Sequence, residues 1–197
     1  MNGLDALNHH LLGMPPVAAM QVRAVAFDGE VLQLQAPLAA NVNDKGCAFG
    51  GSLVSLMTLA GWGLMTLKLR EAGIRAEVYV ADSQVRYLAP LYTDLEASAR
   101  LADDVDWNLV LQAWQARGRA RAGISATVAG PDGAVAALGA AGESATDADE
   151  ADAADCATGA ADAGTGAATD AAATAAGTLP GAAPDCSDSK ASPCLTA

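Results

Sequence analysis

Two adjacent glycines, Gly50 and Gly51, stand where a polar turn runs into a long apolar segment. From Ala48 to Leu67 the chain has no charged residue, and this run predicts a helix that protein surrounds on nearly every face. The first turn of a helix carries unpaired N–H groups and the positive end of the helix dipole. Because glycines leave those amides unshielded, the helix start could hold a carbonyl oxygen that becomes an anion during acyl transfer. A tight turn with a cap is the alternative interpretation.

Acyl transfer to water also needs a base, and two carboxylates are candidates. Asp44 lies in the polar loop before the glycines, and its alternative role is to order that turn as an exposed side chain. Asp82 lies in a predicted strand that is apolar on both faces, where a lone acid is costly unless it is paired, for example with Arg86. Cys47 has no histidine near it in sequence, which favours a packed thiol over a nucleophile.

Periodicity and turn residues predict the other elements. Helical spacing predicts a leading helix before Gly13 and a later helix from Trp107 to Gly118. Alternating patterns predict strands at 20–27, 31–36, 75–88, 95–101, 120–129 and 134–139. Since Asp28-Gly29 and Pro131-Asp132-Gly133 suit tight hairpins, neighbouring strands should be antiparallel. The prediction is an α+β hotdog fold, an antiparallel sheet wrapped around the long central helix.

The strand at 75–88 is apolar on both faces around Val78 and Val80, which indicates that it is covered twice. A second subunit is the simplest cover. We therefore expect a homodimer or a dimer of dimers.

The end of the chain differs in composition from the rest. Between Gly142 and Thr178 it has no Val, Ile, Leu, Met or aromatic residue, so it cannot bury enough apolar surface to offset its ordering entropy. The predicted organisation is a folded domain at 1–141 and a disordered, acidic tail rich in Ala, Asp, Gly and Thr at 142–197.

Charge and composition exclude several functional classes. Of the 23 acidic and 11 basic residues, ten acidic and one basic lie in 140–197, so the predicted domain is nearly balanced and a nucleic-acid partner has no support. A membrane span is disfavoured because four glycines and four hydroxyl residues dilute the apolar run. The N-terminus lacks the pattern of a secretion signal, and the cysteine spacing suits no zinc site. The sequence thus predicts a cytoplasmic protein with no metal and no cofactor.

The loop and the helix resemble the thioesterase domain named after the C-terminal half of YiiD, over residues 4–142. The residues that carry the resemblance are Asn43-Asp44-Lys45-Gly46-Cys47-Ala48-Phe49-Gly50-Gly51-Ser52, Thr58-Leu59-Ala60-Gly61-Trp62 and Val85-Arg86-Tyr87-Leu88-Ala89-Pro90. The resemblance implies a hotdog subunit that dimerises, with acyl-thioester sites at the subunit interface.

The resemblance also implies residue roles. The amides of Gly50 and Gly51 would hold the thioester carbonyl, and Asn43 would position the thioester or the water. Two positions depart from the family pattern: many relatives have His at Phe49, and many have Asp or Glu at Thr58. A threonine hydroxyl cannot take a proton from water at neutral pH without a partner, so Asp44 or Asp82 would have to act as the base.

The predicted function is hydrolysis of an acyl thioester, linked to coenzyme A or to a carrier. The alternative is a binding module for acyl thioesters or fatty acyl groups that keeps the fold without a working base. The expected catalytic residues are Asn43, Asp44, Gly50 and Gly51, and the expected substrate-binding residues are Phe49, Ser52, Thr58, Asp82 and Ser83. Alternating arginines at 117, 119 and 121, with Lys45 and Arg86, could meet the coenzyme A phosphates or form a solvated basic face.

Overall fold

The computed structural model describes residues 3–147, and the rest of the expected tail lies outside the described residues. The helices are α1 (Gly3–Gly13), α2 (Pro15–Met20), α3 (Gly50–Glu71) and α4 (Trp107–Arg117), with a short 3-10 turn at Leu38–Ala40. The strands are β1 (Arg23–Phe27), β2 (Leu32–Ala36), β3 (Ala76–Tyr87), β4 (Leu95–Leu101), β5 (Arg119–Ala129) and β6 (Val135–Asp147).

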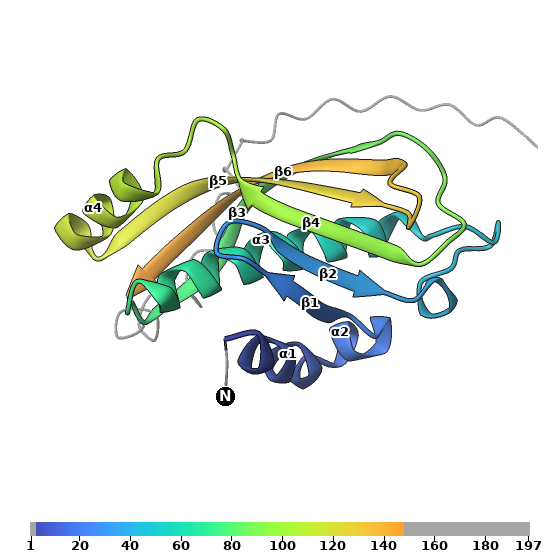
Figure 1. Ribbon diagram of the computed structural model, residues 1–197, viewed down its shortest axis with the longest axis horizontal. Coiled ribbons are helices and arrows are strands. Elements are labelled where there is room, and N and C mark those ends of the chain that lie inside the picture. Colours follow the sequence, from blue (N-terminus) through green and yellow to red (C-terminus); the bar gives the residue numbers. More distant parts are fainter. Residues whose placement is uncertain (1–2, 148–197) are drawn as a thin grey trace, which may run out of the picture. The chain divides into compact units, whose positions relative to one another are not determined.

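Within the described residues the six strands form one sheet in the order β1-β2-β4-β5-β6-β3. Each neighbouring pair is antiparallel. The long helix α3 lies across one face of this curved sheet (Figure 1). The structure therefore confirms the α+β hotdog architecture, with β1 and β3 as the edges of the sheet.

Helix α3 is the centre of the main apolar core. Its length and composition would suit a membrane span, but 67% of its most apolar window is buried inside the fold. Gly63 permits close packing, since a Cβ there would lie 2.8 Å from Leu32 and 3.2 Å from Leu7. The all-round apolar character of α3 thus reflects a helix covered by the sheet on one side and by α1 on another.

The N-terminal segment contains one helix that the sequence did not indicate. Pro15 was expected only to stop the first helix, but it also begins α2. Proline is tolerated in the first turn because the N–H that it lacks has no intrahelical partner there. Helix α1 buries Leu7 and Leu11, and its His10 stacks on Trp62 of α3 with ring centroids 5.1 Å apart.

The alternation of side chains along β3 shifts by one residue in the middle of the strand. The pairing register with β6 shifts between Val80 and Asp82, which marks a β-bulge. A bulge inserts one unpaired residue, so the strict alternation expected along 75–88 is broken. As a result Val80 and Ser83 both lie on the side of α3, although they were expected on opposite faces.

Strand β3 is covered on one side only by the described part of the chain. Val78 is buried, whereas Tyr79 and Val80 are exposed. The backbone of β3 pairs with β6 and with no other described strand. The second cover that was expected for this strand, another subunit, stays a prediction.

Strand β6 extends beyond the boundary expected at residue 141. Residues 142–147 pair with both β3 and β5, so they belong to the sheet and not to the tail. Ala145 is fully buried between Val78 and Ala120. The inner face of β6 packs against α3 and requires small side chains. The segment therefore has few large apolar residues, and the sequence did not predict it as a strand.

Ending the chain at Gly142 is therefore expected to be harmful. Compared with a chain that ends at Asp147, it should unfold about 10 °C lower, since it loses ladder hydrogen bonds on both sides of β6 and the buried Ala145. Thermal unfolding at pH 5 is the suitable measurement, because the pKa of Glu143 is about 7 in the folded longer chain, so that its buried carboxyl is then mostly uncharged there and does not offset the loss. Equal melting temperatures would show that 143–147 do not contribute to the fold.

Candidate active site

The loop before α3 is fixed by hydrogen bonds to distant segments. The buried side chain of Asn41 donates to the carbonyls of Met20 and Pro37 at 3.0 and 2.8 Å. The amide of Phe49 donates to the Asn41 carbonyl at 2.7 Å, and the amide of Ala48 donates to the Leu91 carbonyl at 2.7 Å. These hydrogen bonds fix the position of the first residue of α3 relative to the preceding loop.

Asn43 closes the loop internally. Its Oδ1 accepts from the amides of Lys45 at 2.8 Å and Cys47 at 3.3 Å, and its Nδ2 lies 3.2 Å from the Cys47 Sγ. Gly46 has a φ of 77°, which explains the Asn-to-Gly spacing as turn chemistry. The Asn43 side chain therefore shapes the loop, and the thiol of Cys47 is a packed group beside it. Asp44 stands exposed at the tip of the same loop.

The first turn of α3 has donors without helical partners. The helix begins after Phe49, which provides no side-chain cap, and the first intrahelical bond runs from the Leu53 amide to the Phe49 carbonyl at 3.1 Å. The amides of Gly50, Gly51 and Ser52 precede that bond. These groups and the helix dipole favour an oxygen that carries negative charge.

Aromatic rings lie against both glycines. A Cβ on Gly51 would stand 2.3 Å from the Phe49 ring, and one on Gly50 would stand 3.4 Å from the Tyr87 hydroxyl. That hydroxyl donates to the Gly50 carbonyl at 3.1 Å, which ties the end of β3 to the helix start. The glycine pair is thus needed to admit the rings as well as to expose the amides.

Exposed apolar side chains lie on the segments that adjoin this helix start. They lie on segments that are tied to it by the hydrogen bonds above: Val42, Phe49, Tyr87, Leu88 and Tyr92. Ser83 is exposed on the α3 side of β3, and Thr58 is half-buried two turns along the helix. Ser52, by contrast, is buried. An apolar rim beside oriented amides suits a carbonyl attached to an acyl chain.

Asp82 lies on the other face of the sheet. It forms an ion pair with Arg121 of β5, not with Arg86. The pair crosses β6 above Gly142, where a Cβ would stand 3.1 Å from the Asp82 Oδ2 and 3.2 Å from the Arg121 Nε. The structure therefore does not bring Asp82 together with the helix start.

Replacing Asp82 by Asn is expected to change stability little. Both partners of the pair are well exposed, 67% for Asp82 and 59% for Arg121, and exposed ion pairs contribute about 0–1 kcal/mol. Chemical denaturation at pH 7 should place the variant within about 1 kcal/mol of the wild type. A loss several times larger would mean that the pair organises β3.

The residue that sequence analysis missed is Glu143. Its side chain points from β6 toward α3, is 0% exposed, and neither carboxylate oxygen has a hydrogen-bond partner among the described residues. Burial, and then the charge of Asp82, raise the pKa of Glu143 to about 7. Because it falls in the Ala-, Gly- and Thr-rich stretch assigned to the tail, its strand position could have been found only from the alternation of residues 135–147.

Room for the Glu143 carboxylate comes from Gly61. A Cβ at Gly61 would stand 3.1 Å from the Glu143 Oε1. Gly61 lies three residues after Thr58, so the two positions share one face of α3. Glu143 thus presents a carboxylate to the helix face on which the family pattern places an acid, one turn further along.

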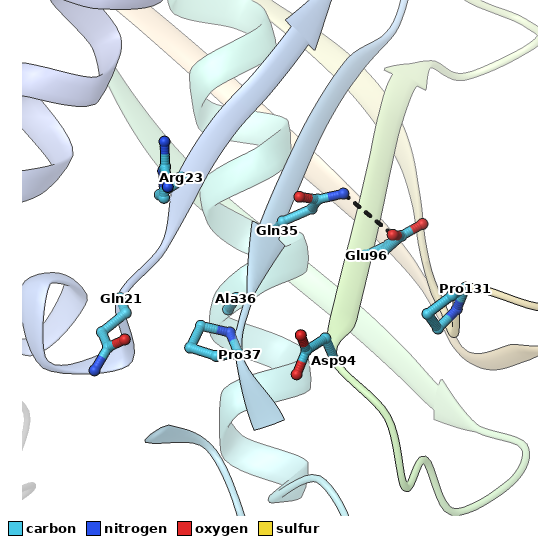
Figure 2. A pocket seen from close by; sticks show the side chains of 8 residues that line it. All are labelled: Gln21, Arg23, Gln35, Ala36, Pro37, Asp94, Glu96 and Pro131. Carbon is cyan, nitrogen blue, oxygen red and sulfur yellow. Dashed lines mark hydrogen bonds between the residues drawn. The ribbon is translucent and has the colours of Figure 1, made fainter. Parts of the chain in front are cut away.

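A surface hollow of about 390 Å³ lies elsewhere, at the ends of β1, β2 and β4 (Figure 2). It is lined by Gln21, Arg23, Gln35, Ala36, Pro37, Asp94, Glu96 and Pro131. Three of its polar side chains already have partners: Gln35 donates to Glu96 at 3.1 Å, and Asp94 accepts from the Leu38 amide at 2.9 Å. The hollow includes none of the residues at the start of α3, and we assign no chemistry to it.

Comparison with known proteins agrees with this geometry. The family described as "Putative thioesterase (yiiD_Cterm)" matches residues 6–140. A protein of unknown function from Chlorobaculum tepidum is 26% identical, with a TM-score of 0.68 over 73% of this chain and 93% of its own. The "putative thioesterase" of Shewanella oneidensis is 28% identical, with a TM-score of 0.66 over 73% of this chain and 97% of its own. A thioesterase from Haemophilus influenzae, 17% identical with a TM-score of 0.60 over 75% of this chain and 92% of its own, shares the fold.

Proposed function

The chain belongs to the family described as "Putative thioesterase (yiiD_Cterm)", and from this premise we propose that it hydrolyses acyl thioesters. One observation supports the proposal above the others: the start of α3 has uncapped amides at Gly50 and Gly51 and is rimmed by exposed apolar side chains. The amides would hold the thioester carbonyl oxygen and stabilise the negative charge that develops when water attacks the carbon. The apolar rim would receive the acyl chain, and the thiol side would be coenzyme A or a carrier.

The proposed assembly is a homodimer joined through β3. This strand has twelve residues and an edge with which no other described strand pairs, and an unprotected edge of that length is a template for pairing with a second chain. Exposed Tyr79 and Val80 lie on it. Light scattering at micromolar concentration should give twice the subunit mass or a multiple of it, whereas a monomer would remove the proposed interface.

A second candidate function is supported by the positions of the two expected bases. Asp82 lies on the far face of the sheet, and Asp44 stands at an exposed loop tip. A chain without a base at the helix start would bind acyl thioesters without cleaving them.

A series of acyl-CoA substrates of increasing chain length separates the two functions. Thiol release is recorded with a disulfide reagent, and binding is recorded by calorimetry on the same samples. Saturable thiol release supports hydrolysis. Binding without release supports the binding module, and the absence of both would contradict each proposal.

Asp44→Asn is the matched test of the loop carboxylate. If Asp44 is the base, kcat should fall by about 10²–10⁴-fold while KM changes little. If Asp44 only orders the turn, the variant should stay within a few-fold of the wild type. Because the substitution keeps the side-chain volume at an exposed position, loss of folding is not expected, and circular dichroism checks this.

A further inference from the structure

Burying Glu143 reduces the stability of the fold, which suggests that the residue is kept for a function. A buried carboxylate that lacks hydrogen bonds loses its hydration without compensation, and such groups concentrate at functional sites. Neither oxygen of Glu143 has a partner among the described residues. Gly61 provides the space for this carboxylate, although glycine inside a helix is itself unfavourable by about 1 kcal/mol.

Glu143 packs against the face of α3 that contains Thr58 and Gly61. This face of the helix has no acidic residue at the position where the family pattern places one. Thr58 stands one turn before Gly61 and cannot act as a base. Val80 is opposite Glu143 in the β3–β6 register and is 38% exposed. Water would therefore have to reach the carboxylate past Val80, on the edge strand of the described sheet.

We infer that Glu143 is the general base of the proposed hydrolysis, and that it serves the thioester held at the helix start of a second copy of the chain. The inference rests on the proposed function. It assigns the role of base to a strand carboxylate other than Asp82.

The helix start of the same chain is out of reach for Glu143. Gly61 lies ten residues after Gly51, and a helix rises about 1.5 Å per residue, so the two positions are about 15 Å apart along α3. A glutamate side chain cannot span that length. If Glu143 acts at a helix start, that start must come from another chain.

The topology allows a second copy to supply it. Strand β3 runs antiparallel to α3: its end contacts Gly50 through Tyr87, while Val78 accepts a hydrogen bond at 3.0 Å from Trp62, twelve residues further along the helix. Two β3 edges can pair antiparallel about a two-fold axis that passes through residue 83 or residue 84. Either pairing sets Tyr87 of the second copy, and with it that copy's helix start, within one residue of the position opposite Val80.

The chemistry balances with one carboxylate. Ionised Glu143 takes a proton from water, the water oxygen bonds to the carbonyl carbon, and the carbonyl electron pair moves onto the oxygen held by the amides of Gly50 and Gly51. When the intermediate collapses, the carbon–sulfur bond breaks and the thiolate takes the proton back from Glu143. The products are a carboxylic acid and a thiol. A pKa of about 7 suits a group that must both accept and return a proton near neutrality.

Glu143→Gln tests the base directly. It keeps the shape of the side chain but cannot accept the proton, so kcat should fall by about 10²–10⁴-fold with little change in KM. The wild-type kcat should also decline on the acid side of neutrality as Glu143 becomes protonated. Glu77→Gln, at an exposed glutamate of β3, is the control and should match the wild type.

Mixing two inactive variants tests the contribution of the second copy. Glu143→Gln keeps its helix start, and Gly51→Pro keeps its Glu143. After subunit exchange, a mixed dimer would hold one intact site, and an equal mixture should recover about a quarter of the wild-type activity. A variant that failed only because it misfolded could not restore its partner.

The outcomes separate the inference from the function on which it rests. Wild-type hydrolysis with Glu143→Gln within threefold of it would overturn the inference and leave the proposed function standing. A large loss without recovery in the mixture would overturn the role of the second copy. A wild type that hydrolyses no acyl-CoA of the series would instead contradict the proposed function.

Discussion

Glu143→Gln is expected to make the protein more stable than the wild type at pH 8. The pKa of Glu143 is raised in the folded state from its ordinary value of 4.5 to about 7. The folded protein therefore binds this proton more tightly than the unfolded chain does. The stability that the proton contributes is full below pH 4.5 and is lost as the pH rises through 7.

The size of this effect follows from the cost of the buried charge. Above pH 7 the folded wild type carries a buried, ionised carboxylate that the charge of Asp82 disfavours and that has no hydrogen-bond partner among the described residues, and the glutamine variant does not. We expect the stability of the variant to exceed that of the wild type by about 3 kcal/mol at pH 8 and by no more than about 1 kcal/mol at pH 5. Thermal unfolding at both pH values, at one protein concentration, measures the difference.

Glu77→Gln is the control for this comparison as well. It removes an exposed glutamate whose charge should not affect folding at either pH. If wild type and Glu143→Gln follow parallel stability curves from pH 5 to pH 8, Glu143 is not a buried carboxyl with a raised pKa.

Gly51→Pro should reduce turnover by about 10²–10³-fold, the usual cost of one oxyanion donor. Proline is compatible with the first turn of a helix and deletes the amide that the proposal assigns to the carbonyl oxygen. Any side chain at this position must displace the Phe49 ring, which is 55% exposed and can move outward.

Gly51→Ala separates the two effects of this substitution. Alanine displaces the ring in the same way but keeps the N–H group. The ratio of kcat/KM between the alanine and proline variants therefore reports the amide alone. Equal values for the two would mean that the Gly51 amide holds no charge in the transition state.

Local sequence signals predicted the frame of the fold. Asp28-Gly29 and Pro131-Asp132-Gly133 do connect antiparallel strands, and the uncharged run does form the central helix. Asp106 caps α4 by accepting from the Asn108 amide at 2.8 Å. These features depend on residues close in sequence, so turn and capping rules apply to them directly.

The face assignments in β3 failed for a tertiary reason. Period-two alternation was applied across the whole strand, but the bulge after Val80 shifts the remainder by one residue. The sequence near Val80 has no residue that would predict a bulge. The partner of Asp82 was misassigned for a related reason, because Arg121 reaches it across the gap that Gly142 leaves in β6.

Glu143 was not predicted as a site residue because the composition of its segment resembles that of a disordered tail. Residues 135–147 have few large apolar side chains because β6 runs beneath α3, where Met57 approaches Gly139 and Gly61 approaches Glu143. Close packing of a helix on a strand requires small residues, and the same residues are typical of a disordered tail. The pairing of β6 with both β3 and β5 shows that residues 142–147 belong to the sheet.

Hydrolysis of an acyl-CoA in ¹⁸O-labelled water, with enzyme in excess over substrate, tests the central claim most directly. If water activated by a carboxylate attacks the carbonyl held at the helix start, each acid released in a single turnover carries one ¹⁸O atom, and free thiol appears in equal amount. An acid without the label would show that an enzyme carboxylate attacks the carbonyl carbon and transfers its own oxygen to the product. Recovery of the intact thioester, with no thiol released, would contradict hydrolysis of this substrate.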